Sequence, residues 1–286
     1  MGAVRAGGFA PRGFAPGKPN AMNLRGKVVV VTGASSGIGR ALSIELARQG
    51  CRLLLTALEA DDLAKLQREL ESAGQPVAAR PADLANPQSR AALLDWLRQQ
   101  AAPPDILINN AGVGGRFGSF AASDLADMQK VVELNVQGLL QLTHGLIPLL
   151  RARPEARIVN VSSGVARLPY PGLAVYGATK AFISSFSESL ACELAGTRIR
   201  VLCFHPGFTA SGFLQRSAMD MRKVPRFLVH SPEFVARRLV RALVADRRWG
   251  FSDALSGLSA RFGGLLPHRL RIRLFRNLFW EVPNGR

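Results

Sequence analysis

A glycine-rich segment, Thr32-Gly33-Ala34-Ser35-Ser36-Gly37-Ile38-Gly39, directly follows the apolar β-branched run 28–31 and opens a helical stretch over 38–49. This strand-turn-helix context is the one that a dinucleotide-binding glycine motif requires. Gly33 is expected to permit the tight turn, Gly37 to let the backbone approach a pyrophosphate, and Gly39 to permit close packing of the helix. Ser35, Ser36 and Ile38 are predicted to belong to the same cofactor site. Because glycine-rich turns also serve purely structural ends, the segment alone leaves that second interpretation open.

The rest of the chain alternates strand-like and helix-like segments. Apolar strand candidates lie at 28–31, 53–55, 77–79, 106–108, 158–161 and 199–204, and helical patterns lie at 38–49, 61–72, 87–100, 124–150 and 174–195. Short apolar strands separated by helices describe a parallel sheet covered on both faces. We therefore predict a Rossmann-type, doubly wound α/β fold with three layers, α/β/α, in a single domain. In such sheets ligands bind at the carboxyl ends of the strands.

Length and composition agree with one globular domain, and the charge gathers at the chain ends. The chain has 286 residues, of which 48% are hydrophobic, and a formal net charge of +17. Residues 1–22 carry three basic and no acidic residues, residues 216–286 carry 15 basic and five acidic residues, and the stretch between is nearly balanced. Without an interleaved aromatic platform or a recognised motif, the basic ends do not indicate specific nucleic-acid binding.

Three segments are expected along the chain. Residues 1–22, rich in Gly, Pro and Ala, are predicted to be a disordered basic extension, with a translation start at Met22 as the favoured explanation. Residues 23–253 are predicted to be a Rossmann-fold catalytic domain and residues 254–286 a basic amphipathic tail.

The cysteines, the histidines and the lengths of the apolar runs limit which kinds of protein the sequence can encode. The three cysteines are far apart and outside any C-x-x-C spacing, which indicates a reduced, cytoplasmic protein. The four histidines show no metal-ligand spacing, so no metal site is predicted. No uninterrupted apolar run reaches the roughly 18 residues that a membrane span needs.

Tyr176 and Lys180 carry the chemical signal. At positions i and i+4 of a helix they share a face, so an ammonium can lie near the phenol oxygen and favour the phenolate. Ser163 lies thirteen residues before Tyr176 at a strand end, where its hydroxyl can hold a substrate oxygen. Asp83, after the third strand, can accept a hydrogen bond from an adenine or simply begin a helix. Asn110, after the fourth strand, is interpreted as mainly structural, at the edge of the cofactor.

Taken in order, six motifs closely resemble those of the classical short-chain dehydrogenase/reductase family: residues 32–39, 109–112, Asn135, Ser163, Tyr176 with Lys180, and Pro206-Gly207. The resemblance covers about residues 25–250. It implies an NAD(P)(H)-dependent oxidoreductase that interconverts a hydrophobic carbonyl compound and its secondary alcohol by hydride transfer. The alternative is a non-catalytic dinucleotide-binding regulatory protein, against which the intact set of polar residues argues.

The resemblance also implies a role for each polar residue. Tyr176 would be the general acid/base, and Lys180 would lower its pKa and hydrogen-bond the nicotinamide ribose. Ser163 would orient and polarise the substrate oxygen, with Ser162 as the neighbouring alternative that the spacing disfavours. Asn135 would hold a water that links Lys180 to solvent.

The cofactor site departs from the family pattern in two places. The nicotinamide-binding segment corresponds to Pro206, Gly207 and Ser211, the last of which replaces the family's usual Thr and keeps its hydroxyl. After the second strand, NAD users present Asp where this chain has Ala57, and NADP users often present Arg where it has Leu58. Without the Asp a 2′-phosphate would be repelled less, although Glu59 is nearby. Arg40 is the candidate cation, with a solvated helix residue as the alternative. NADP(H) is slightly favoured over NAD(H).

The substrate is expected to be small and apolar. Loops after the fourth to sixth strands should close a pocket with the apolar residues Phe117, Leu168, Tyr170, Phe208, Phe213, Leu214, Met219, Met221, Phe227 and Leu228. Packing of these residues against the core or a neighbouring subunit is the equal alternative. A homo-oligomer, dimer or tetramer, is expected.

The tail has an amphipathic pattern over 265–280, with leucines largely on one side and arginines on another. A basic amphipathic helix at a terminus can lie on an anionic membrane surface. Docking of its apolar face on its own domain or across a dimer interface is slightly favoured over that peripheral membrane contact. The tail loosely resembles that of reductases related to hydroxysteroid and 3-ketoacyl reductases.

Overall fold

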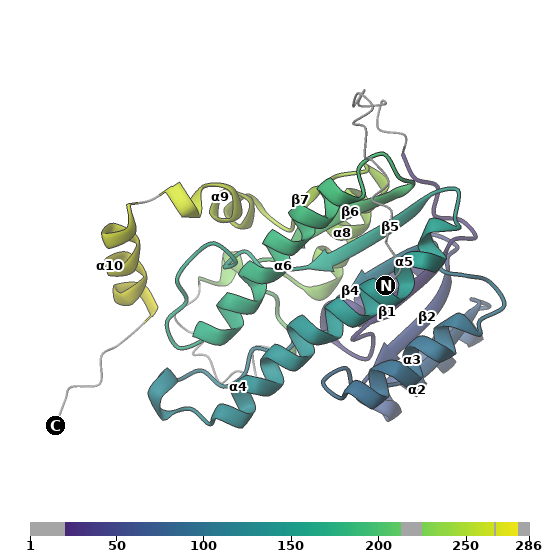
Figure 1. The fold of residues 1–286 in the computed structure, drawn as a ribbon, viewed down its shortest axis with the longest axis horizontal. Helices are drawn as coiled ribbons and strands as arrows, with labels where there is room; N and C mark the ends of the chain where they lie inside the picture. The colour runs from purple at the N-terminus through teal and green to yellow at the C-terminus, as the bar shows by residue number, and fades with distance from the viewer. Residues whose placement is uncertain (1–20, 213–224, 266, 280–286) are drawn as a thin grey trace, which may run out of the picture.

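The computed structural model describes residues 21–212, 225–265 and 267–279. Its strands are β1 (Val28–Thr32), β2 (Arg52–Ala57), β3 (Val77–Pro81), β4 (Ile106–Asn109), β5 (Ala156–Val161), β6 (Ile199–His205) and β7 (Trp249–Phe251). They form one parallel sheet in the order β3-β2-β1-β4-β5-β6-β7 (Figure 1). The predicted Rossmann-type, single-domain α/β fold is confirmed. β7 is a strand that the sequence patterns did not predict.

The helices cover both faces of this sheet. They are α1 (Gly37–Arg48), α2 (Ala60–Ser72), α3 (Pro87–Arg98), α4 (Leu125–Val132), α5 (Leu139–Arg151), α6 (Ala174–Glu193), α8 (Pro232–Val244), α9 (Ala254–Phe262) and α10 (His268–Phe279). Apolar side chains of α1, α2 and α8 pack on one face, and those of α3, α5 and α6 pack on the other. The first layer also holds Met22, whose backbone N–H donates to the carbonyl of Val244 at 2.9 Å.

Local sequence signals fix several helix starts. Asn86 accepts a hydrogen bond from the backbone N–H of Ser89, and Ser231 accepts one from that of Phe234. Each of these caps is followed by a proline at the first helical position, which tolerates the missing N–H. These two caps therefore define where α3 and α8 begin.

The long helix predicted over 124–150 is interrupted. A π-helical segment, η2 (Glu133–Gly138), separates α4 from α5, and it contains Asn135. π-turns inside α-helices occur frequently at functional sites because they redirect side chains. Short 3-10 turns complete the described elements: η1 (Phe120–Ala122), η4 (Arg226–Leu228) and η5 (Gly263–Leu265).

Candidate active site

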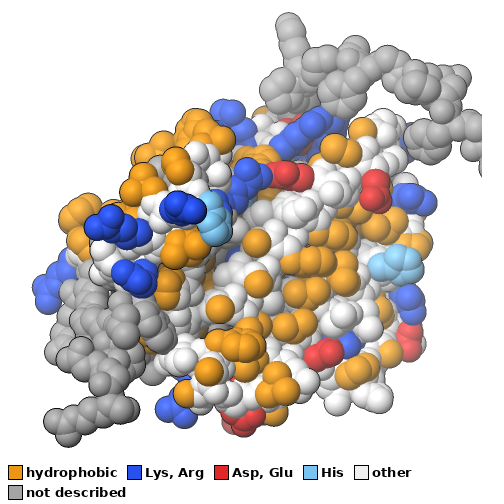
Figure 2. All heavy atoms as spheres, turned by 60° about the vertical axis from the view of Figure 1, so that its left-hand side comes forward, with side chains coloured by type: hydrophobic (Ala, Val, Ile, Leu, Met, Phe, Trp, Pro, Cys, Tyr) orange, Lys and Arg blue, Asp and Glu red, His pale blue; other side chains and the backbone are white. Residues whose placement is uncertain are grey.

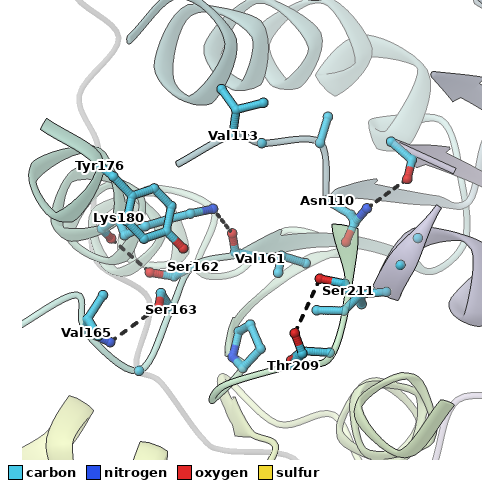
Figure 3. Close-up of a pocket in the computed structure, with 18 of the residues that line it drawn as sticks. Asn110, Val113, Val161, Ser162, Ser163, Val165, Tyr176, Lys180, Thr209 and Ser211 are labelled. Atoms are coloured by element: carbon cyan, nitrogen blue, oxygen red, sulfur yellow. Dashed lines mark hydrogen bonds between the residues drawn. The ribbon is translucent and has the colours of Figure 1, made fainter. Parts of the chain in front are cut away.

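A cavity of about 600 Å³ opens at the carboxyl ends of β1, β2, β4, β5 and β6. Its walls come from segments that are far apart in the sequence and include Gly33, Asp83, Asn110, Ser163, Tyr176, Lys180 and Ser211. Figure 3 shows Tyr176 and Lys180 on one side of it and Asn110 and Ser211 on another. The sheet therefore brings most of the sequence-predicted site residues to one place.

The glycine-rich segment adopts the conformation that its glycines allow. Gly33 and Gly37 have φ angles of +65° and +53°, which favour glycine. A Cβ on Gly39 would lie 2.0 Å from the carbonyl oxygen of Gly33, so only glycine permits this close packing. The Ser36 side chain makes no capping hydrogen bond to α1, and the first turn of α1 has no acidic residue. The backbone donors at this helix start therefore suit an anionic group.

The acidic side chains near this loop are held by specific contacts. Ser35 donates from Oγ to Glu59 at 2.8 Å, and both residues line the cavity. Asp83 also lines the cavity, and its carboxylate accepts a hydrogen bond from the backbone N–H of Ala85 at 2.8 Å. Arg40, the candidate cation for a phosphate, instead forms an exposed ion pair with Glu69.

Asn110 ties two strand ends together. Its side-chain amide donates to the backbone carbonyl of Thr32 at 2.9 Å, and its backbone N–H donates to the Thr32 hydroxyl at 3.0 Å. These contacts match its interpretation as a mainly structural residue at the edge of the cavity.

Tyr176 and Ser163 meet at the cavity wall. Tyr176 lies on α6, and its hydroxyl hydrogen-bonds the Ser163 side chain, which follows β5. Ser163 also accepts from the backbone N–H of Val165 at 3.3 Å, as Figure 3 shows. Ser162 instead donates to the Lys180 backbone carbonyl at 2.8 Å and contacts the Ser184 hydroxyl. The hydroxyl beside Tyr176 is therefore that of Ser163.

Lys180 lies one turn along α6 and is buried. Its ammonium donates to the backbone carbonyl of Val161 at 2.9 Å and lies 5.7 Å from the centroid of the Tyr176 ring. Burial lowers the pKa of Lys180 to about 8. Burial raises the pKa of Tyr176 to about 12, and the Ser163 hydrogen bond only partly opposes this. Desolvation is thus the largest cause acting on the Tyr176 pKa, and the lowering by Lys180 that the resemblance implies stays a prediction.

Asn135 is buried in the π-turn, behind the described lining of the cavity. Its side-chain oxygen accepts from the backbone N–H of Val113, and its amide nitrogen donates to the Val113 carbonyl and to the Thr179 hydroxyl. The side chain thus fastens the segment after β4 to α6. A Cβ on Gly112 would lie 3.1 Å from Asn135 Oδ1 and 3.4 Å from Lys180 Nζ, so this glycine lies between the two.

The segment after β6 carries Pro206, Gly207 and Ser211, all of which line the cavity. Ser211 donates from Oγ to the Thr209 carbonyl at 3.4 Å. The backbone N–H of Gly207 donates to the Ser252 hydroxyl at 2.8 Å, and Ser252 donates to Asp253 at 2.6 Å. A Cβ on Gly207 would lie 2.4 Å from the Asp253 carboxylate, so a side chain here would displace that carboxylate.

Asp253 and Ser252 are site residues that the sequence patterns missed. Asp253 begins α9 by accepting from the backbone N–H of Ser256, and it lies 3.4 Å from His230 Nε2. Its pKa is lowered, because hydrogen bonds from Ser252 and Ser256 outweigh the desolvation that opposes them. The only available signal was an Asp at a helix start, which is common at caps that have no other role.

The cavity is apolar away from these polar groups. Of the predicted lining residues, Leu168, Tyr170, Phe208 and Leu228 line it. Phe117 packs against the cluster of Tyr170, Leu173 and Tyr176, and Phe227 is exposed. Phe213, Leu214, Met219 and Met221 lie outside the described residues. Leu255 and Phe275, from α9 and α10, also line the cavity and were not predicted to do so.

The part of the chain that the structure describes holds neither a metal-binding cluster nor a membrane-spanning helix. Within it, no three or more His, Cys, Asp or Glu side chains gather as a metal-binding group. None of the described helices is long and apolar enough to cross a membrane.

The family model described as short chain dehydrogenase matches residues 27–222. Sulfoacetaldehyde reductase 2 from Chromohalobacter salexigens is 35% identical over 65% of this chain and 74% of its own length. Glycine betaine reductase ATRR from Emericella nidulans is 34% identical, but the chain spans only 18% of that longer protein.

Solved structures extend the similarity over the whole fold. A short-chain dehydrogenase from Sphingobium yanoikuyae in complex with NADPH has a TM-score of 0.76 and 28% identity, and covers 91% of this chain and 98% of its own. A short chain dehydrogenase/reductase from Burkholderia phymatum in complex with NAD has a TM-score of 0.75 and 26% identity. The match covers 93% of this chain and 100% of that structure's chain. Relatives named as reductases and dehydrogenases give no support to a non-catalytic regulatory protein. The chain belongs to the classical short-chain dehydrogenase/reductase family of NAD(P)-dependent oxidoreductases.

Proposed function

We propose that this chain interconverts a hydrophobic ketone and its secondary alcohol, with Tyr176 as the proton-transfer group. The observation that carries the proposal is the meeting of Tyr176, Ser163 and Lys180 on the wall of a cavity that continues to the glycine-rich loop. A proton-transfer group and an anion-binding helix start thus share one cavity.

The residues present fit a nicotinamide dinucleotide. The free backbone donors at the start of α1 and the left-handed glycines of its loop suit a pyrophosphate. Gly33, Ser35, Ser36, Gly37, Ile38 and Gly39 would hold that end, with Asp83 and Asn110 further along and Pro206, Gly207 and Ser211 beside the nicotinamide. When bound in its reduced form, such a cofactor supplies the hydride.

Tyr176 completes the reaction by moving the proton. In the direction of reduction, its hydroxyl donates a proton to the carbonyl oxygen while hydride reaches the carbonyl carbon, which yields the alcohol. A phenol with a pKa of about 12 keeps its proton near neutral pH, so the hydroxyl is ready to donate. In the direction of oxidation the same oxygen accepts the alcohol proton, which requires the phenolate.

The neighbouring groups orient this step. Ser163 holds the substrate oxygen next to the Tyr176 hydroxyl, to which it is already hydrogen-bonded. Lys180 lies beneath the same ring as a buried cation, and opposite charge favours the phenolate when the proton leaves. Asn135 acts through Val113 and Thr179, whose positions it fixes, so we assign it a positioning role beside the implied water relay.

The substrate class follows from the cavity beyond Tyr176. Beside the polar groups, the cavity is lined by the apolar side chains of Leu168, Tyr170, Leu228, Leu255 and Phe275. An aliphatic or ring-bearing ketone would bury apolar surface there at roughly 25 cal/mol per Å². A charged or strongly polar substrate would lose hydration without a matching set of partners.

Substitution of Tyr176→Phe tests the assignment. It removes the proton donor and leaves the ring, so turnover should fall by about 10² to 10⁴-fold while the cofactor dissociation constant stays within about threefold. Turnover is measured by nicotinamide absorbance across a panel of ketones and alcohols, and cofactor binding by titration of the free enzyme with each dinucleotide.

Tyr170→Phe is the matched control, because Tyr170 is the chain's other tyrosine and also lines the cavity. It should alter the substrate KM more than kcat. Equal loss of turnover in both variants, or full activity of Tyr176→Phe, would contradict the assignment.

The cytoplasmic location, the homo-oligomer and the segment boundaries at residues 22 and 253 stay predictions.

A further inference from the structure

We propose that residues 254–265 and 267–279, the cap formed by α9, η5 and α10, rest on an anionic membrane surface and admit the substrate from it. The statement about the substrate rests on the proposed function. The statement about the surface rests on the exposure, charge and position of the cap, which are argued first.

The cap exposes large apolar side chains from both helices. On α9, Leu258 is 57% and Phe262 is 51% exposed, and on α10 Leu270 is 53% exposed. Leu274, on the same side of α10 as Leu270, is also exposed, so the described part of the domain leaves the leucine side of α10 uncovered. Ile272, which lies among the arginines, is exposed as well. The expectation that this side docks on its own domain is therefore met only at Phe275, which is buried. Contiguous exposed apolar side chains mark surfaces that bind partners or membranes.

Cations are interspersed with these apolar side chains. Arg261, Arg269, Arg273 and Arg276 are exposed, and no acidic residue occurs between positions 254 and 279. Figure 2 shows hydrophobic and basic side chains side by side on the left of the molecule, where the cap lies. Arginine can bury its stem among apolar groups while its head reaches lipid phosphates, so the pattern fits an interfacial helix.

The charge also decides between a membrane and a second copy of this chain. A two-fold interface places the same patch on both sides, so the exposed arginines of the cap would face the same arginines without any carboxylate of the cap between them. Anionic lipid headgroups provide the opposite charge. The described helices lack a membrane span, so the cap would lie in the interface plane.

The cap connects this surface to the cavity. Leu255, Ser256 and Ser259 of α9 and Phe275 of α10 line the cavity. Leu255 is 49% exposed, so the cap contributes accessible apolar surface to the wall of the cavity. An apolar substrate dissolved in the bilayer would enter there without crossing water.

Vesicle sedimentation of the full-length protein tests the proposal without any substrate. Wild type should bind vesicles of phosphatidylcholine with 30 mol% phosphatidylserine more tightly than pure phosphatidylcholine. Arg269→Gln/Arg273→Gln should weaken binding by about 25-fold, because each arginine near an anionic surface contributes about fivefold. Leu270→Ser/Leu274→Ser should weaken it by at least about tenfold.

Matched exposed residues elsewhere control for general charge and hydrophobicity. Phe120→Ser/Leu125→Ser and Arg68→Gln/Arg151→Gln change exposed side chains on other elements and should leave binding within about twofold. Equal weakening by cap and control variants would overturn the proposal, as would binding that ignores lipid charge. Loss of a dimer in Leu270→Ser/Leu274→Ser, measured by native mass, would identify a second copy as the occupant instead.

The two proposals fail separately. Vesicle binding without turnover of any carbonyl compound would contradict the proposed function and leave the membrane surface standing. Turnover of a water-soluble ketone without vesicle binding would contradict the membrane surface and leave the proposed function standing. If both hold, anionic vesicles should lower the KM for a ketone with a long alkyl chain in wild type but not in Leu270→Ser/Leu274→Ser.

Discussion

Glu59 is the residue at which the choice between NAD(H) and NADP(H) is expected to be made. It lines the cavity beside the glycine-rich loop, and Ser35 holds its carboxylate in place. A carboxylate there accepts a hydrogen bond from a ribose hydroxyl and repels a 2′-phosphate. The sequence prediction slightly favours NADP(H) because Asp is missing at Ala57. Glu59 and the ion pair of Arg40 with Glu69 are instead the features expected to disfavour a 2′-phosphate.

Glu59→Gln should raise the kcat/KM with NADP(H) relative to NAD(H) by at least about tenfold. Like charges about 4 Å apart repel by roughly 1 to 4 kcal/mol between the limits of water and a protein surface. Initial rates with both reduced cofactors and one ketone measure the ratio. Glu71→Gln removes an exposed carboxylate at the other end of α2 and should leave the ratio unchanged. A ratio that moves equally in both variants would show that Glu59 has no specific role.

That Ser163, Tyr176 and Lys180 meet at one cavity was accessible from the sequence, but their electrostatics were not. Strand ends and helical spacing placed Ser163, Tyr176 and Lys180 near one another without coordinates. The balance between desolvation and charge depends on burial, which a spacing does not specify. The raised pKa of Tyr176 and the partners of Asn135 therefore emerge only from the packed structure.

At the scale of elements, the π-turn between α4 and α5 positions Asn135, and Arg90 of α3 fixes that turn. The Arg90 side chain is 2% exposed. It donates to the Leu84 carbonyl at 2.9 Å, to Gln141 at 2.7 Å and to the Glu133 carboxylate at 3.2 Å. A second contact reaches the Glu133 backbone carbonyl at 3.4 Å. One guanidinium thus joins the segment after β3 to both ends of the turn.

Arg90→Met should destabilise the protein by about 1–3 kcal/mol, because buried acceptors lose their donor. At a temperature where the variant is still folded, kcat should fall while the cofactor KM changes little, since Asn135 is displaced but the glycine-rich loop is not. Urea unfolding and steady-state kinetics measure the two effects. Glu133→Gln removes the half-exposed partner and should cost less than about 1 kcal/mol. Equal effects of both substitutions would refute the positioning role of Arg90.

Elements with a strong apolar period were predictable, and those that depend on tertiary contacts were not. The strands β1 to β6 and the helix 174–195 follow from their patterns almost to their bounds. β7 has only three residues, and it forms because Cys203, Phe204 and His205 of β6 offer a parallel edge. The π-turn has an ordinary helical sequence, and its contacts with the buried Arg90 join residues far apart in the chain.

At the scale of the molecule, the cavity is lined by residues from both halves of the sheet and from the C-terminal helices. A ligand that binds only this assembled state raises the stability of the whole fold by mass action. The net charge of +17 has little part in this, because its excess lies at the chain ends rather than around the strand ends. The stability of the molecule should therefore respond to dinucleotide far more than to salt.

Saturation with the preferred nicotinamide dinucleotide should raise the unfolding midpoint of the wild-type chain by roughly 5 to 10 °C. At a ligand concentration one hundred times Kd the gain is about 2.7 kcal/mol, and each kcal/mol shifts Tm by about 2–4 °C in a domain of this size. Gly37→Ala and Gly74→Ala both put a side chain at a left-handed glycine, with φ +53° and +73°, and both should lower the starting Tm. Only Gly37→Ala should also lose the ligand-induced rise, because its Cβ would enter the cavity loop 3.2 Å from Ser211, whereas a Cβ at Gly74 meets open space. Thermal unfolding with each dinucleotide measures this, and a rise that survives Gly37→Ala would place the cofactor elsewhere.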